Sequence, residues 1–166
     1  MLPIKRILAP VDFSSPSEAA VSVAAEMASK MDSELCLVHV VPMLPTLPSF
    51  STALHEGEYE KELHDEAGRR LAKIADRLGK QGIRAITKVG TANEVGMEIV
   101  RTAEEDQADL IVIATHGMTG WRKLAFGSVA EKVVRLATCP VLVLRAIEAE
   151  KAAESPALST SASVAR

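Results

Sequence analysis

The amino-acid sequence predicts an α/β fold: a five-stranded parallel sheet with helices on both faces. Short apolar runs alternate with longer segments of helical periodicity, in the order β-α-β-α-β-α-β-α-β, and this alternation favours a parallel sheet. Several of the runs are almost continuously apolar, as in strands that are buried on both faces. Hydrophobic residues make up 48% of the chain and aromatic residues only 3%, so Val, Leu, Ile and Ala must form the core.

The first half of the chain predicts two strands and one helix before a long loop. Residues 4–11 form the first strand, and a capping box, Ser15-Pro16-Ser17-Glu18, starts a helix over residues 16–31. The apolar run 34–41 is the second strand, which a proline ends. Residues 42–55 contain several prolines and small polar residues. A loop of this length inside a compact domain is often a functional or mobile segment.

The middle of the chain predicts a second helix, a third strand and a third helix. Residues 56–81 are amphipathic, with a predicted core stripe of Leu63, Ala67, Leu71, Ile74 and Leu78, and Gly82 is expected to close that helix. Residues 84–89 alternate between polar and apolar, as in an edge strand. The segment Thr91-Ala92-Asn93-Glu94 has the pattern of a capping box for the next helix. The fourth strand is expected over residues 109–114.

The last part of the chain predicts one more helix and one more strand. The helix covers residues 128–137, and the strand covers 141–145. The rest of the chain is rich in Ala, Ser and Glu and has no clear period. We therefore expect one folded domain over residues 1–146 and a disordered tail over residues 147–166.

Composition restricts the class of protein. A length of 166 residues suits one domain with its own core. The net charge of −3 disfavours a general nucleic-acid binder. Cys36 and Cys139 lie in apolar segments and are expected to be core residues without a disulfide. No metal-ligand spacing, signal peptide or membrane-length apolar run occurs, so we expect a cytoplasmic protein without membrane association.

The segment between the fourth strand and the last helix carries the clearest functional signal. Glycines occur at 117, 120 and 127, where the backbone can approach a ligand closely. The first amides of the following helix lack intrahelical partners and favour an anion. Arg122 and Lys123 are present, and no Asp or Glu occurs between residues 110 and 130. The segment suits a phosphate group. The alternative is a capping box made by Ser128 and Glu131, which needs no ligand.

A second signal is expected to meet this segment in space. With the strand order 3-2-1-4-5 and right-handed crossovers, the loops after the first and fourth strands flank the point where the order reverses. Asp12 follows the first strand, so its carboxylate would face the same crevice as the glycine-containing segment. The alternative for Asp12 is a local Asx-turn. His39 ends the second strand and is expected to be a hydrogen-bonded core or rim residue.

Several motifs together resemble the universal stress protein family. They are Pro10-Val11-Asp12-Phe13-Ser14, His39-Val40, Ala114-Thr115-His116-Gly117 with nine residues before Gly127-Ser128, and Cys139-Pro140-Val141-Leu142-Val143. The resemblance covers roughly residues 4–145. The ATP-binding branch of this family carries Gly-x2-Gly-x9-Gly-Ser/Thr in the same strand–loop–helix setting. This chain has Ala114 in place of the first glycine, and its methyl group is compatible with a negative φ.

The resemblance implies a Rossmann-like, adenine nucleotide alpha hydrolase-like fold that binds ATP, with or without Mg²⁺ or Mn²⁺. Asp12 would meet the adenine or ribose, and Val40 would meet the adenine through its backbone. His116 would contact phosphate or ribose, or brace the loop. The residues implied in nucleotide binding are Pro10, Val11, Asp12, Val40, Ile113, Ala114, His116, Gly117, Gly127, Ser128 and Val129. The family also implies a homodimer through the last strand, Val141–Leu144.

Three functions remain open from the sequence. The first is a nucleotide-binding regulatory module that reports stress to an unknown protein partner. The second is a slow ATPase or phosphoryl-transfer enzyme, although the segment offers no acidic group to act as a base or metal ligand. The third is a dimeric scaffold without nucleotide. We expect no catalytic residue and no protein metal site, and an enzyme is the less favoured alternative.

Overall fold

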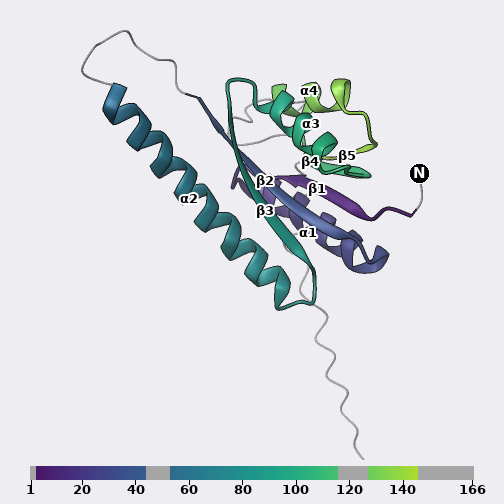
Figure 1. Cartoon of the computed structure of the whole chain (residues 1–166). Helices are drawn as coiled ribbons and strands as arrows, with labels where there is room; N and C mark the ends of the chain where they lie inside the picture. Colours follow the sequence, from purple (N-terminus) through teal and green to yellow (C-terminus); the bar gives the residue numbers. More distant parts are fainter. Residues whose placement is uncertain (1–2, 44–52, 116–126, 146–166) are drawn as a thin grey trace, which may run out of the picture.

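The computed structural model describes residues 3–43, 53–115 and 127–145 (Figure 1). Five parallel strands form one sheet in the order β3-β2-β1-β4-β5, which confirms the predicted topology. In chain order the elements are β1 (Arg6–Pro10), α1 (Ser15–Met31), β2 (Glu34–Pro42), α2 (Ala53–Gly79), β3 (Ala85–Ala92), α3 (Val95–Glu105), β4 (Leu110–Ala114), α4 (Ser128–Leu136) and β5 (Val141–Leu144).

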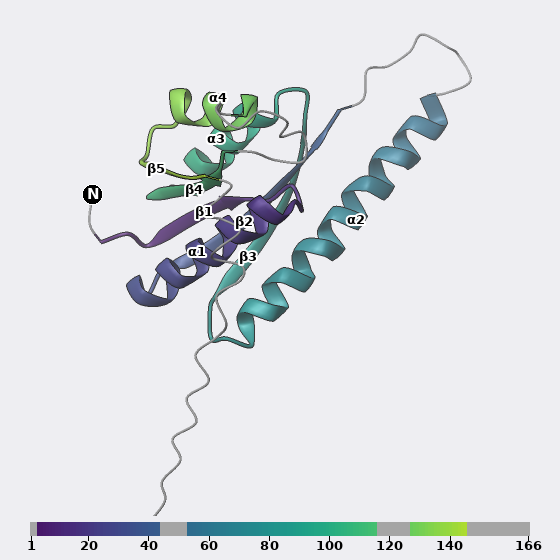
Figure 2. The same ribbon diagram turned by 180° about the vertical axis from the view of Figure 1, so that it is seen from behind.

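Helices cover both faces of the sheet. α1 and α2 pack on one face, and α3 and α4 pack on the other (Figures 1 and 2). Because successive strand residues point to opposite faces, each strand contributes to two cores. Ile7 of β1 joins the core under α1 and α2, whereas its neighbour Leu8 joins the core under α3 and α4. β1 and β4 lie at the centre of the sheet and are buried on both faces.

Reversal of strand order occurs between β1 and β4. Ile7 pairs with Leu110, and Leu8 pairs with Ile111, although about a hundred residues separate them in sequence. β2 and β3 lie on one side of this pair, and β5 lies on the other. The loops that leave the carboxyl ends of β1 and β4 therefore diverge and leave room for a crevice.

The start of α1 differs by one residue from the prediction. Ser14, and not Ser15, is the N-cap: its backbone is extended, and its hydroxyl accepts a hydrogen bond from Ser17 N at 3.3 Å. Pro16 still lies in the first turn, where its missing N–H costs no hydrogen bond. The sequence contains consecutive serines, and the loop after β1 decides which of them caps the helix.

Two other predicted capping boxes are wrong. Thr91 lies inside β3, because that strand pairs with β2 as far as Ala92, which lies opposite Pro42. α3 then begins at Val95 without a side-chain cap. Ser128 is the first residue of α4, whose N-cap is Gly127, and no side chain caps this helix either.

The second helix is longer at its start than predicted. α2 begins at Ala53 and ends at Gly79, and Gly82 lies beyond it in a turn with φ +78°. The predicted core stripe is confirmed at Ala67, Leu71, Ile74 and Leu78, all of which are buried. Among the described residues, no helix is both long and apolar enough to span a membrane.

Candidate ligand site at the carboxyl end of the sheet

A cavity of about 380 Å³ lies at the carboxyl ends of β1, β2 and β4, where the strand order reverses. Most of its lining is apolar, and the polar side chains come from the loop after β1, the first turn of α1, β2, the end of β4 and the start of α4. The lining residues are Pro10, Val11, Asp12, Ser17, Val38, His39, Val40, Pro42, Val95, Ile99, Ile113, Ala114, Thr115, Gly127, Ser128, Val129 and Ala130. The two signals found in the sequence therefore meet at one place.

Nine of the residues predicted for nucleotide binding surround this cavity. They are Pro10, Val11, Asp12, Val40, Ile113, Ala114, Gly127, Ser128 and Val129. His116 and Gly117 lie outside the described residues. The fold gathers the nine from three strands, the loop after β1 and the start of α4, and their role in binding stays a prediction.

Asp12 is held by the loop that it starts. Its Oδ1 accepts hydrogen bonds from Ser14 N at 3.1 Å and from Ser14 Oγ at 2.5 Å, while its own N–H donates to Ser17 Oγ at 3.3 Å. This arrangement is the Asx-turn expected as the alternative role. Asp12 also lines the cavity. The turn therefore fixes the carboxylate at the cavity wall.

His39 is anchored beside the same loop, against the carbonyl of Val11. Its Nδ1 lies 2.6 Å from the carbonyl oxygen of Val11. A carbonyl oxygen only accepts, so Nδ1 must carry a proton and donate. Burial lowers the pKa of His39, so the ring is neutral at pH 7 and its Nε2 holds a lone pair. The expected hydrogen-bonded rim histidine is confirmed.

Phe13 connects the cavity wall to α2. Its φ of +62° is unusual for a bulky side chain and marks a constrained loop directly after Asp12. The centroids of the Phe13 and His39 rings lie 4.6 Å apart. The guanidinium carbon of Arg70 lies over the Phe13 ring, 3.9 Å from its centroid. A cation over an aromatic face is an attractive contact. These contacts hold the β1–α1 loop in place.

The amino end of α4 opens on the same cavity. Thr115 N donates to Leu144 O at 2.8 Å, and Gly127 N donates to Thr115 O at 2.7 Å, so Gly127 is fixed beside the end of β4. The first bond of α4 runs from Glu131 N to Gly127 O. The amides of Ser128, Val129 and Ala130 precede it and belong to the first turn, where they and the helix dipole favour an anion.

Ala114 fits its position without strain. It is the last residue of β4, is 7% exposed and does not belong to the residues with positive φ. Its methyl group is part of the apolar wall of the cavity. The departure from glycine is therefore compatible with the backbone of this strand.

Sequence reasoning missed several lining residues, including Val38, Pro42, Val95, Ile99 and Ala130. Val38 and Val40 lie on the same face of β2, because residues two apart share a face. That periodicity could have found Val38. Val95 and Ile99 come from α3, and only the packing of α3 against β2 brings them to the cavity.

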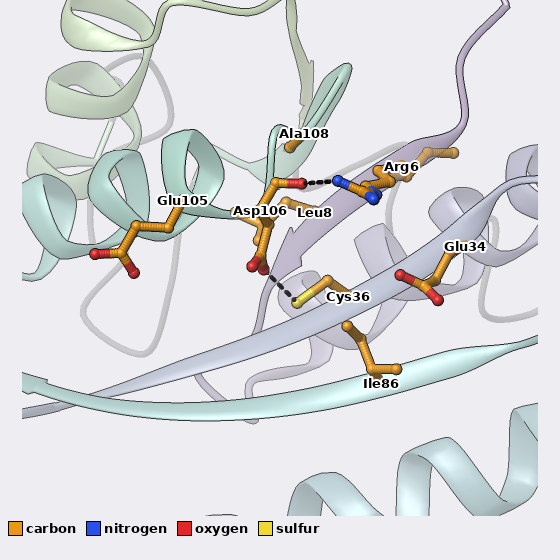
Figure 3. A pocket seen from close by; sticks show the side chains of 9 residues that line it. Arg6, Leu8, Glu34, Cys36, Ile86, Glu105, Asp106 and Ala108 are labelled. Atoms are coloured by element: carbon orange, nitrogen blue, oxygen red, sulfur yellow. Dashed lines mark hydrogen bonds between the residues drawn. The ribbon is translucent and has the colours of Figure 1, made fainter.

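A second hollow, of about 240 Å³, lies at the amino ends of the strands (Figure 3). Asp106 joins several of the polar groups in and beside it. Asp106 forms an ion pair with Lys88 and accepts a hydrogen bond from the Cys36 thiol at 3.5 Å, and its carbonyl oxygen accepts from Arg6 at 2.8 Å. Burial, and then the charge of Asp106, raise the pKa of Cys36 to about 12. The thiol stays protonated, and both cysteines are free of disulfides, as predicted.

Comparison with known proteins shows the family. The profile of the universal stress protein family matches residues 3–145. Universal stress protein MJ0531 of Methanocaldococcus jannaschii is 36% identical over 143 residues, which cover 85% of this chain and 82% of the relative. The structure of MJ0577, from the same organism, has a TM-score of 0.71 and 28% identity, with 86% of this chain and 96% of that chain covered.

A third match shows the fold alone. It is the universal stress protein from Archaeoglobus fulgidus in complex with dAMP, which has a TM-score of 0.57 and 23% identity and covers 86% of this chain and 98% of that chain. The family profile covers nearly the whole described structure, and the relative from M. jannaschii matches over most of both chains. The chain belongs to the universal stress protein family.

Proposed function

We propose that this protein is a homodimeric regulatory module of the stress response that binds an adenine nucleotide, ATP foremost, at the carboxyl end of its sheet. One observation carries the proposal. The uncapped amino end of α4 opens on an apolar cavity at the reversal of strand order, with Asp12 also on the wall of that cavity. A nucleotide matches both environments: its anionic phosphates suit the amino end of α4, and its base suits the apolar cavity.

The cavity offers a distinct surface for each part of a nucleotide. Its volume lies within the usual range of ligand pockets, roughly 300–1,000 Å³. The side chains of Val40, Ile99 and Ile113 supply apolar contact for the base. Asp12 supplies a carboxylate that can accept a hydrogen bond from a ribose hydroxyl or an exocyclic amine. The amides of Ser128 and Val129 then receive the phosphates.

Support also comes from a protein of the same fold. The A. fulgidus universal stress protein was solved in complex with dAMP, so this fold can accommodate an adenine nucleotide. The choice of ATP for the present chain depends on its own cavity and on the glycine-containing segment that precedes α4. A Mg²⁺ or Mn²⁺ ion would be held by the phosphates, because the described residues contain no group of three or more metal-binding side chains.

The proposed dimer pairs two copies through β5. This strand forms one edge of the sheet, and its four residues, Val141–Leu144, are apolar and only partly buried. An open apolar edge favours pairing with another strand. Adding β5 of a second copy would satisfy the outer backbone groups and cover the side chains.

Calorimetric titration with ATP tests the nucleotide site, using the wild type and Gly127→Val. Gly127 has φ −61° and ψ 147°, which valine adopts readily, so the variant should fold. The valine side chain would occupy space beside the phosphates and cost at least one charge-assisted hydrogen bond, about 1.5–3 kcal/mol, or about 10- to 100-fold in Kd. Gly57→Val is the matched control, since nothing lies within 4 Å of a Cβ there.

Equal ATP affinity in Gly127→Val and the wild type would remove the start of α4 from the proposal. The same samples also distinguish a binding module from an enzyme. ADP above the no-protein blank would favour the slow ATPase, whereas bound ATP without ADP favours the regulatory module. Mass spectrometry of the natively purified protein would identify the nucleotide that it carries.

A further inference from the structure

The outward face of α2 is not covered by any other described part of the chain. The inward face of this helix packs on β2 and β3 through buried residues such as Leu71 and Ile74. On the opposite face the side chains are exposed and charged. α2 lies at the outside of the molecule in both views (Figures 1 and 2). A surface helix normally mixes charges of both signs along its length.

On α2 the charges are separated by sign along the helix. Residues 56–66 contain six acidic residues and one lysine, whereas residues 69–80 contain five basic residues and one aspartate. Within these halves a single exposed stripe follows helical spacing: Glu58, Glu62 and Glu66, and then Arg69, Lys73 and Arg77. The stripe borders a hollow of about 340 Å³ between α1 and α2. One half of the face is therefore acidic and the other half basic.

Such a face is complementary to itself. A two-fold axis through the middle of α2, between Ala67 and Gly68, sets two copies of the helix antiparallel. Glu58, Glu62 and Glu66 of one copy then face Arg77, Lys73 and Arg69 of the second copy, and the same contacts repeat by symmetry. A parallel arrangement would place like charges together, so the charges also select the direction.

A row of glycines runs along the same helix. Gly57, Gly68 and Gly79 are eleven residues apart, close to three helical turns, and so lie above one another. A Cβ atom at each would meet nothing within 4 Å, so packing within the chain does not require glycine there. Glycine is a poor residue for a helix interior. The row lies about a third of a turn around the helix from the charged stripe, so it is a separate feature of α2 and the contact through the stripe does not use it.

We propose that α2 is a self-association surface that binds α2 of a second copy antiparallel, with opposite charges facing each other. This contact goes beyond the proposed nucleotide binding and does not depend on it. α2 packs on β2 and β3, whereas β5 forms the opposite edge of the sheet. The two contacts therefore use different sides of the molecule, and together they join dimers into larger assemblies.

Charge inversion tests the proposal by sedimentation velocity on the full chain. One variant carries Glu58→Lys and Glu62→Lys, and the other carries Lys73→Glu and Arg77→Glu. Each makes the stripe mostly one sign, so self-association through α2 should weaken about tenfold or more. An equimolar mixture of the two variants restores opposite charges across the contact and should recover the large species. Circular dichroism checks that both variants fold, and ATP titration should show unchanged affinity.

Salt and cross-linking give independent readouts. Raising the salt from about 0.1 M to about 1 M shortens the Debye length from about 10 Å to about 3 Å and should dissociate the contact. In a Cys139→Ser background, Glu66→Cys and Arg69→Cys face each other across the axis and should cross-link when the two variants are mixed, whereas Lys80→Cys should not cross-link to itself.

Four results would overturn the proposal. The first is a wild type that does not associate beyond one β5 dimer, and the second is inverted variants that assemble like the wild type. The third is a mixture of the two variants that does not form the large species again. The fourth is one variant that assembles equally well with an unrelated charged protein. Loss of ATP binding with intact α2 association would instead contradict only the proposed function.

Discussion

The two ends of the sheet contain hollows of different chemistry, about 240 Å³ at the amino end and about 380 Å³ at the carboxyl end. At the amino end, the carboxylate of Asp106 binds Lys88 and Cys36, and its backbone carbonyl accepts from Arg6, so both carboxylate oxygens have partners. Figure 3 shows the contacts with Cys36 and Arg6. At the carboxyl end, α4 begins without a side-chain cap, and its first amides line a mostly apolar cavity. The partners of the polar groups therefore distinguish the two hollows.

Topology explains why the two ends differ. In a parallel sheet every helix runs back antiparallel to the strands, so the amino ends of the helices gather at the carboxyl ends of the strands. The positive ends of the helix dipoles therefore surround the cavity beside Asp12 and Gly127. At the other end, an anion would meet Glu34, Glu105 and Asp106.

Leu8→Ala should cause the largest loss of stability. Leu8 lines the amino-end hollow and is fully buried, so truncation leaves a cavity and should lower the free energy of unfolding by about 2–5 kcal/mol. Urea unfolding measures the loss. ATP affinity, measured well below the melting temperature, should stay at the wild-type value. A ligand site at this hollow would instead show up as a change in binding.

Asp106→Ala should also lower stability without affecting nucleotide binding. The substitution leaves the buried thiol of Cys36 and the ammonium of Lys88 without their acceptor, which should cost about 1–3 kcal/mol. Denaturant unfolding and ATP titration are the measurements. A variant as stable as the wild type would show that these contacts do not stabilise the amino end.

Two substitutions at Asp12 separate the turn from the ligand contact. Asp12→Asn can keep the hydrogen bond from Ser14 N but removes the charge, so its stability should remain close to that of the wild type. Asp12→Ala loses the turn as well and should cost about 1 kcal/mol of stability. We expect ATP affinity to fall in both variants, by about tenfold. Unchanged ATP affinity in both variants would show that Asp12 forms the turn and does not contact the nucleotide.

His39 should make the carboxyl end sensitive to mild acid. Its pKa is lowered from 6.5 in the folded protein, whereas the unfolded chain takes up the proton at that ordinary value. The unfolded state therefore binds more protons just below pH 6.5, and stability falls as the pH drops from about 6.5 through the folded pKa. His39→Gln keeps a donor for Val11 O and should flatten this part of the pH profile of unfolding. An identical profile in the variant would assign the slope to other groups.

Much of the fold followed from local patterns. The apolar runs, the helical periods and their alternation predicted the order of elements, and topology rules then placed Asp12 beside the start of α4. The buried stripe of α2 followed from a 3.6-residue period that holds for any helix with one buried face, as Leu71 and Leu78 show.

Capping was the least predictable feature. Thr91-Ala92-Asn93-Glu94 has the residue pattern of a capping box, but β2 extends to Pro42 and β3 pairs with it as far as Ala92. Pairing between distant strands outweighed a local preference worth about 1 kcal/mol. Gly127 replaced Ser128 as the N-cap of α4 for a similar reason, since its N–H bonds to Thr115 at the end of β4.

The sequence alone determined the class of fold, the order of its elements and the two loops at which a ligand site should form, because these depend on periodicity and chain direction. The tautomer of His39, the contacts of the Phe13 ring with His39 and Arg70, and the contribution of Ile99 to the cavity became apparent only in the folded structure. These features join residues that lie far apart in the chain, and no local pattern encodes which of them will touch. The contacts arise when α2 and α3 pack on opposite faces of the same sheet.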